Sequence, residues 1–60
     1  MKPELVINRP HNSRKKWICI FCTYINGVTE EVARFTHKGD ANLYLMRLEN
    51  ADTIERITVE

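Results

Sequence analysis

Two cysteines and two histidines are the candidate zinc ligands of this sequence. Cys19 and Cys22 have the C-x₂-C spacing of half a zinc site, and His11 and His37 would complete a tetrahedral set. Residues three apart in an extended strand point to opposite faces, so the two thiols reach one metal only where the strand breaks. The same geometry forbids a disulfide between them. We therefore expect two free, half-buried cysteines, no metal site and no cofactor.

A catalytic site would need a base beside one thiol, or two carboxylates held in one place. The strand pairing expected below sets Cys19 beside Arg34 and points it away from His37, the histidine that the fold brings nearest. Glu30 and Glu31 are adjacent, so they project from opposite sheet faces, which suits solvation better than acid-base chemistry. The sequence therefore predicts a protein that is not an enzyme.

A basic segment precedes the single tryptophan. Residues 9–17 combine cations, hydrogen-bonding side chains and an aromatic ring, which are the materials for phosphate contacts and base stacking. The alternative is a solvated loop or arm over residues 8–16 whose charges keep an edge strand from pairing with another chain. A formal net charge of +1 argues against strong long-range attraction to nucleic acid. The candidate nucleic-acid contacts are Arg9, His11, Arg14, Lys15 and Lys16.

The elements that position these residues start with a β-hairpin. Asn26-Gly27 tolerates the two positive φ angles of a type I′ turn and is flanked by runs rich in β-branched and aromatic residues. We expect arms over residues 16–25 and 28–37 joined by a two-residue loop. That register pairs Ile18–Phe35, Ile20–Ala33, Cys22–Glu31 and Tyr24–Thr29 on one face, and Trp17–Thr36, Phe21–Val32 and Ile25–Val28 on the other.

A helix and a final strand follow the hairpin. Asp40 has the chemistry of an N-cap, and residues 41–50 are good helix formers. Helical spacing puts Ala41, Tyr44, Leu45 and Leu48 on one stripe, with Leu43 and Met46 off it. Residues 54–59 read as a strand with Ile57 and Val59 on one side. Upstream, Leu5-Val6-Ile7 lies between prolines and predicts a short edge strand.

The chain is therefore expected to be one α+β domain over residues 1–60, with a small antiparallel sheet of three to four strands, one helix on one face, and the order (β)ββαβ. At 43% hydrophobic and 28% charged residues, it is neither a disordered tail nor a membrane segment. The start Met1-Lys2-Pro3-Glu4 is not followed by the apolar stretch of a secretory signal, so we expect the protein to remain in the cytoplasm and away from membranes.

One helix covers one face of a small sheet, yet both faces of the hairpin carry large apolar side chains. If the helix covers Ile18, Ile20, Ala33 and Phe35, the opposite face holds an apolar patch that marks a dimer or partner interface. The alternative is that the amino-terminal segment folds back over this patch through Leu5 and Ile7. The residues of the patch are Trp17, Phe21, Ile25, Val28 and Val32.

Two resemblances follow from the layout. The tryptophan-led hairpin, the helix and the final strand over residues 16–59 resemble the small RNA-polymerase inhibitor of T7-like phages. That family implies protein binding through a sheet edge and arginines of the last strand, where this chain has Arg56. Trp17 and the stretch Thr36-His37-Lys38-Gly39-Asp40-Ala41 look like the arm-binding domains of phage and transposon integrases, which implies DNA binding by a three-stranded sheet.

Our hypothesis from the sequence is a phage-encoded interaction module that inhibits a host protein by occupying its surface. The alternative is a nucleic-acid-binding module that uses the basic segment, and a homodimer is a further possibility. The expected partner-binding residues are Trp17, Phe21, Val32, Arg34 and Arg56.

Overall fold

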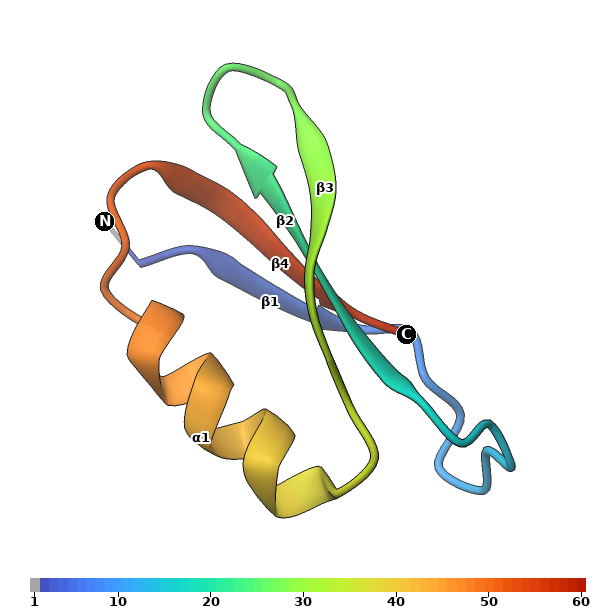
Figure 1. Cartoon of the computed structure of the whole chain (residues 1–60). Coiled ribbons are helices and arrows are strands. Elements are labelled where there is room, and N and C mark those ends of the chain that lie inside the picture. Colours follow the sequence, from blue (N-terminus) through green and yellow to red (C-terminus); the bar gives the residue numbers. More distant parts are fainter. Residues whose placement is uncertain (1) are drawn as a thin grey trace.

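The computed structural model describes residues 2–60, which form four strands and one helix (Figure 1). In chain order the elements are β1 (Glu4–Ile7), β2 (Ile18–Tyr24), β3 (Thr29–Phe35), α1 (Lys38–Leu48) and β4 (Ile54–Val59). The predicted α+β class and the predicted order of elements are confirmed. Within residues 2–60, no helix is long and apolar enough to cross a membrane.

The strands form one mixed sheet in the order β1-β4-β2-β3, where the sequence predicted an antiparallel one. The last strand enters between the first two, because β4 runs antiparallel to β2 and parallel to β1. β2 and β3 form the antiparallel hairpin that the sequence predicted. β1 and β3 are therefore the two edges of the sheet, and the short edge strand expected near the amino terminus is confirmed.

One face of the sheet supplies the core. Ile20 and Cys22 are fully buried on this face of β2. β4 continues it, because Cys22 pairs with Ile57 and Ile20 pairs with Val59. The helix α1 packs over β2 and β3 on this side, as Figure 1 shows. Its core contacts come from the predicted stripe, which consists of Ala41, Tyr44, Leu45 and Leu48.

The helix starts earlier than predicted. It begins at Lys38, and the extended residue His37 (φ −116°, ψ 132°) is the N-cap and makes no side-chain cap bond. The backbone N–H of Ala41 donates to the carbonyl of His37 at 3.2 Å, which closes the first turn. Asp40 is therefore not the N-cap. It lies within the first turn, where its carboxylate faces the partial positive charge of the helix N-terminus.

The hairpin turn has three residues, 25–27, and not the two that were predicted. The N–H of Tyr24 donates to the carbonyl of Val28 at 2.8 Å, and the N–H of Gly27 donates to the carbonyl of Tyr24 at 2.9 Å. Only Gly27 (φ 89°) has a positive φ within residues 2–60. A loop of this length needs one left-handed residue, at its end, and glycine adopts that conformation without steric cost. The side-chain oxygen of Asn26 accepts the N–H of Val28 at 3.1 Å.

A β-bulge at Val32 compensates for the longer turn. Close to the turn, Phe21 pairs with Glu31, one residue away from the predicted partner. Val32 is the extra residue, and beyond it the register returns to the predicted one. The predicted pairs Ile18–Phe35 and Ile20–Ala33 are confirmed, whereas Phe21–Val32, Cys22–Glu31, Tyr24–Thr29 and Ile25–Val28 are wrong.

The amino-terminal segment extends the sheet and does not fold over its second face. Leu5 pairs with Ile57 and Ile7 pairs with Val59, so both side chains of β1 lie on the same side as α1. The interpretation that Leu5 and Ile7 cover the patch around Trp17 is therefore wrong. Within the described residues, the sheet face turned away from α1 is left without a covering element (Figure 1).

The two glycines of the chain offer a matched test of this backbone. Gly27→Ala should lower the free energy of unfolding by about 1 kcal/mol, because alanine at φ +89° is strained. Gly39→Ala should raise it by about 0.5 kcal/mol, because Gly39 lies in the first turn of α1. Nothing lies within 4 Å of either added methyl group. Urea unfolding followed by circular dichroism measures the free energy of unfolding of each variant. Equal changes in the two variants would contradict the turn described above.

Candidate functional site

The sheet face turned away from α1, called here the open face, is built of three rows that cross neighbouring strands. Its middle row consists of Val6, Thr58, Phe21 and Glu31. The row nearer the turn consists of Glu4, Arg56, Thr23 and Thr29. On the other side lie Glu60, Cys19 and Arg34. The open face thus has an apolar and threonine-lined centre with charged residues on both sides.

Trp17 belongs to the open face. It directly precedes β2, and the alternation of the strand puts it on the same side as Cys19 and Phe21. Its side chain is 46% exposed. The ammonium group of Lys16 lies 5.5 Å from the centre of the Trp17 ring, within the range of a cation–π contact. The open face therefore presents one large aromatic ring with a cation beside it.

Both arginines that the sequence singled out lie on the open face, and each is paired with a carboxylate. Arg34 Nε contacts Glu31 Oε1 at 2.6 Å, and Arg56 Nε contacts Glu4 Oε2 at 3.2 Å. Residues three apart on a regular strand face opposite ways, but the bulge between Glu31 and Arg34 brings them to one side. The hydrogen bond to Glu31 raises the pKa of Arg34 above its usual value. Because both pairs are exposed, they add little stability, but they orient the guanidinium groups.

Val32 was expected on this face and is not part of it. It is the extra residue of the bulge and packs, partly buried, against the core on the α1 side. Ile25 and Val28 of the expected patch lie in and beside the turn, where they are 71% and 51% exposed. The structure therefore brings Trp17 and Phe21 together with the two arginines and separates Val32 from them.

The basic segment forms a loop at the end of the hairpin opposite the turn (Figure 1). Arg9 holds this loop closed, because its guanidinium donates to the carbonyl of Trp17 at 2.8 Å and to the carbonyl of Lys15. Arg9 therefore has a structural role that its charge alone did not indicate. The other candidate contacts, His11, Arg14, Lys15 and Lys16, are exposed.

The cysteines lie on opposite sides of the sheet, as the strand period predicted. Cys22 is fully buried in the core, whereas Cys19 is half-buried on the open face and pairs with Arg34. Burial, together with the nearby charge of Glu30, raises the pKa of the Cys22 thiol. The same carboxylate accepts a hydrogen bond from the hydroxyl of Tyr24 at 2.7 Å, and this bond raises the pKa of Tyr24 to about 12.

The histidines do not join the cysteines. His37 is the N-cap of α1 and His11 lies in the basic loop, and both are exposed. Within residues 2–60, no group of three histidine, cysteine or carboxylate side chains is arranged to hold a metal ion. The two histidines therefore lie apart from the two cysteines.

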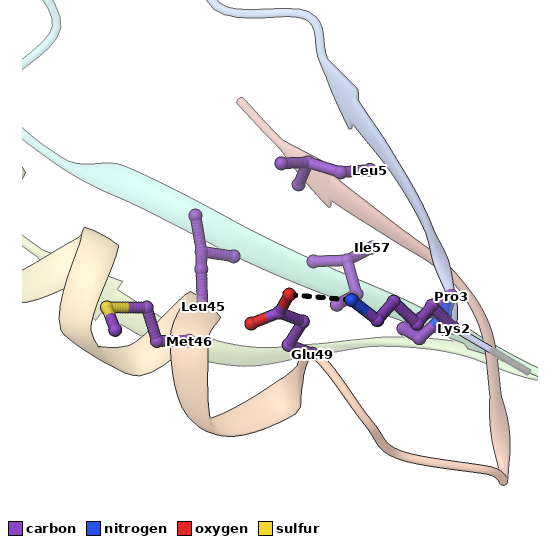
Figure 2. Close-up of a pocket in the computed structure, with 7 residues that line it drawn as sticks. All are labelled: Lys2, Pro3, Leu5, Leu45, Met46, Glu49 and Ile57. Atoms are coloured by element: carbon purple, nitrogen blue, oxygen red, sulfur yellow. Dashed lines mark hydrogen bonds and ion pairs between the residues drawn. The ribbon is translucent and has the colours of Figure 1, made fainter.

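A groove that sequence reasoning missed lies between α1 and β1 on the core side of the sheet (Figure 2). It consists of two hollows of about 320 Å³ and about 480 Å³, both lined by Leu45. The α1–β1 groove is defined by its apolar residues, which are Leu5, Ile7, Ala41, Leu45, Met46 and Ile57. The apolar run Leu5-Val6-Ile7 was visible in the sequence, but its pairing with β4, which creates the groove, was not.

Comparisons with protein-family models, curated proteins and solved structures gave no match. The two resemblances drawn from the sequence layout are therefore untested. The function has to be argued from the surfaces that the fold builds.

The two thiols should differ sharply in reactivity. Iodoacetamide should modify Cys19 readily in the folded protein and Cys22 only on unfolding, because burial shields the Cys22 thiol and raises its pKa. Mass spectrometry of digested samples assigns the modified residue. Cys19→Ser is the control, and it should leave a folded chain that takes up no label without urea. Equal labelling of both thiols in the native state would contradict the described packing.

Proposed function

We propose that this chain is a small non-catalytic interaction module that binds a protein through the open face. The supporting observation is that Trp17, which is 46% exposed, and Phe21 lie on the same sheet face, and that this face has no covering element among residues 2–60. Uncovered aromatic surface of this kind marks interaction sites, and tryptophan and arginine are the side chains that most often dominate binding energy.

The charges of the open face favour a protein partner over a nucleic acid. Arg34 and Arg56 are each neutralised by a neighbouring carboxylate, and Glu60 adds a further negative charge to the same face. Phosphate groups would meet these carboxylates. A protein surface can instead bury the aromatic centre and exchange ion pairs with the arginines at the rim.

The arginines are prepared for such an exchange. Each guanidinium is held at Nε by its carboxylate partner, so its terminal nitrogens are oriented without being used in those two contacts. A partner with an apolar depression for Trp17 and carboxylates placed to meet the two arginines would fit this pattern. In the phage context that the layout suggests, the partner is a host protein and the chain acts by covering its surface.

Trp17→Ala tests this proposal. Affinity capture from a bacterial lysate, followed by mass spectrometry, identifies candidate partners, and titration calorimetry with the purified partner gives the affinity. Trp17→Ala should weaken binding by about 30-fold, the loss typical of a central aromatic contact. Leu43→Ala is the matched control, because Leu43 is 62% exposed on the outside of α1.

Equal affinity of the wild type and Trp17→Ala would contradict the proposal. Sedimentation of the free chain measures its oligomeric state. A dimer that dissociates on Trp17→Ala would identify a second copy as the protein that the open face binds.

The basic loop supports a second candidate, a nucleic-acid-binding module. Here the favouring observation is the contact of Lys16 with Trp17, with exposed His11, Arg14 and Lys15 on the same loop. Cations beside an aromatic ring are the elements of single-strand binding.

A salt titration of DNA binding separates the two candidates. Binding to single-stranded DNA should show a slope of log K against log salt of about −0.7 per phosphate contacted, and replacement of Arg14, Lys15 and Lys16 by glutamine should abolish this binding. Arg47→Gln, at an exposed cation in the last turn of α1, is the control. If the affinity for DNA depends only weakly on salt and is unchanged by the triple replacement, this second candidate is excluded.

A further inference from the structure

The helix covers only part of the sheet face on which it packs. Neighbouring strands lie about 4.8 Å apart, so four strands span roughly 14 Å between the outer two, whereas a helix with its side chains is about 10 Å across. α1 packs over β2 and β3. On β4, Ile57 and Val59 are 3% and 6% exposed, but their β1 neighbours Leu5 and Ile7 are 52% and 63% exposed. The strip of this sheet face over β1 is therefore left uncovered.

The shape of this space matches a second helix. The α1–β1 groove runs along β1, from Leu5 and Ile57 at one end to Ile7 and Val59 at the other. Its opposite wall is the side of α1 that carries Leu45 and the 66% exposed Met46 (Figure 2). β1 and α1 are about 13 Å and about 16 Å long by the rise per residue of each element, which corresponds to about three turns of a helix.

The two ends of the groove differ in charge. At the end near Leu5, Lys2 Nζ contacts Glu49 Oε1 at 3.1 Å across the groove, so the charges there are balanced (Figure 2). The hollow at the other end is lined by Arg9, His11 and Lys38, and no carboxylate lines it. The N-terminus of α1 also lies at this end, with Asp40 in its first turn. An occupant should therefore carry negative charge at one end only.

A second copy of this chain does not meet that requirement. If two copies exchange α1 helices into each other's grooves about a two-fold axis, the two sheets face each other and the helices run in the same direction. The cationic ends of both grooves, with Arg9 and Lys38 from each copy, would then lie together. Repulsion between them favours a different molecule as the occupant.

We propose that the α1–β1 groove binds an amphipathic helix of a partner protein, about three turns long, whose acidic residues lie at the end beside Lys38. Its apolar side chains, spaced as on one helix face, rest on Leu5, Ile7 and Met46. This site lies on the side of the sheet opposite the open face, and its proposal does not rest on the function proposed above.

Selection from a displayed library of helical peptides tests the proposal with the full chain as bait. The peptides share an alanine-rich frame of about 18 residues, long enough to form a helix, with leucines on one face and random residues elsewhere. The selected peptides should carry glutamate or aspartate at one end. Ile7→Ser and Lys38→Glu should each weaken their binding by about tenfold or more, and peptides with lysine at that end should regain affinity for Lys38→Glu.

Control variants separate this site from the other surfaces. Leu43→Ser and Lys15→Glu change an exposed apolar residue and an exposed cation outside the groove, and Trp17→Ala changes the open face. All three should leave peptide binding unchanged. Circular dichroism confirms that each variant is folded, as expected because Ile7 and Lys38 are exposed.

Three results of the peptide selection would overturn the proposal. They are a selection that yields no binder, binders without acidic enrichment at one end, and binders that are insensitive to Ile7→Ser. Self-association that is lost on Ile7→Ser would also overturn it, because the occupant would then be a second copy. Failure of the protein-binding function at the open face would be seen in a separate measurement, as equal partner affinity of the wild type and Trp17→Ala.

Discussion

A four-stranded sheet has two faces to bury, and this chain has one helix of eleven residues with which to cover them. α1 covers the hairpin half of one face, and the described core is limited to what lies beneath it, centred on Ile20, Cys22 and Ile57. A chain of this length buries about 60% of the surface that it exposes when unfolded. The remaining apolar surface stays exposed, and the topology divides it between the open face and the α1–β1 groove.

The three-residue turn and the β-bulge at Val32 compensate for each other in the register of the hairpin. A three-residue turn shifts the hairpin register by one residue, and a shift of one residue along β3 would send each of its side chains to the opposite face. The extra residue at Val32 reverses the shift before it reaches Phe35, which keeps its ring 5.5 Å from that of Tyr44 on α1. The same bulge brings Glu31 and Arg34 to one side. A correction needed for packing thus also sets the charge pattern of the open face.

Local patterns predicted much of this fold, because alternation along a strand and helical spacing act over a few residues. They identified the buried stripe on α1, the last strand, and the shared face of Trp17 and Phe21. They failed where pairing is non-local. Asn26-Gly27 is compatible with a two-residue or a three-residue turn, and the choice depends on how β3 packs, so Val32 was misplaced.

Non-local contacts also explain what was missed at the candidate sites. Arg9 was grouped with the other cations because its carbonyl partners lie six and eight residues away in a loop that has no sequence signature. The groove depends on β4 pairing in parallel with β1, across a separation of about fifty residues in the chain. No short-range pattern encodes such a contact.

The two candidate surfaces are on opposite sides of the sheet, but they share β1. Leu5 and Ile7 line the groove, while Val6 between them lies in the middle row of the open face. β1 has four residues and one neighbouring strand, so it has fewer interactions to hold it than β2 or β4. If a ligand on one side held β1 more firmly, it would also hold the side chain that a ligand on the other side contacts. By linkage, two such ligands would then bind more tightly together than alone, without a change in fold.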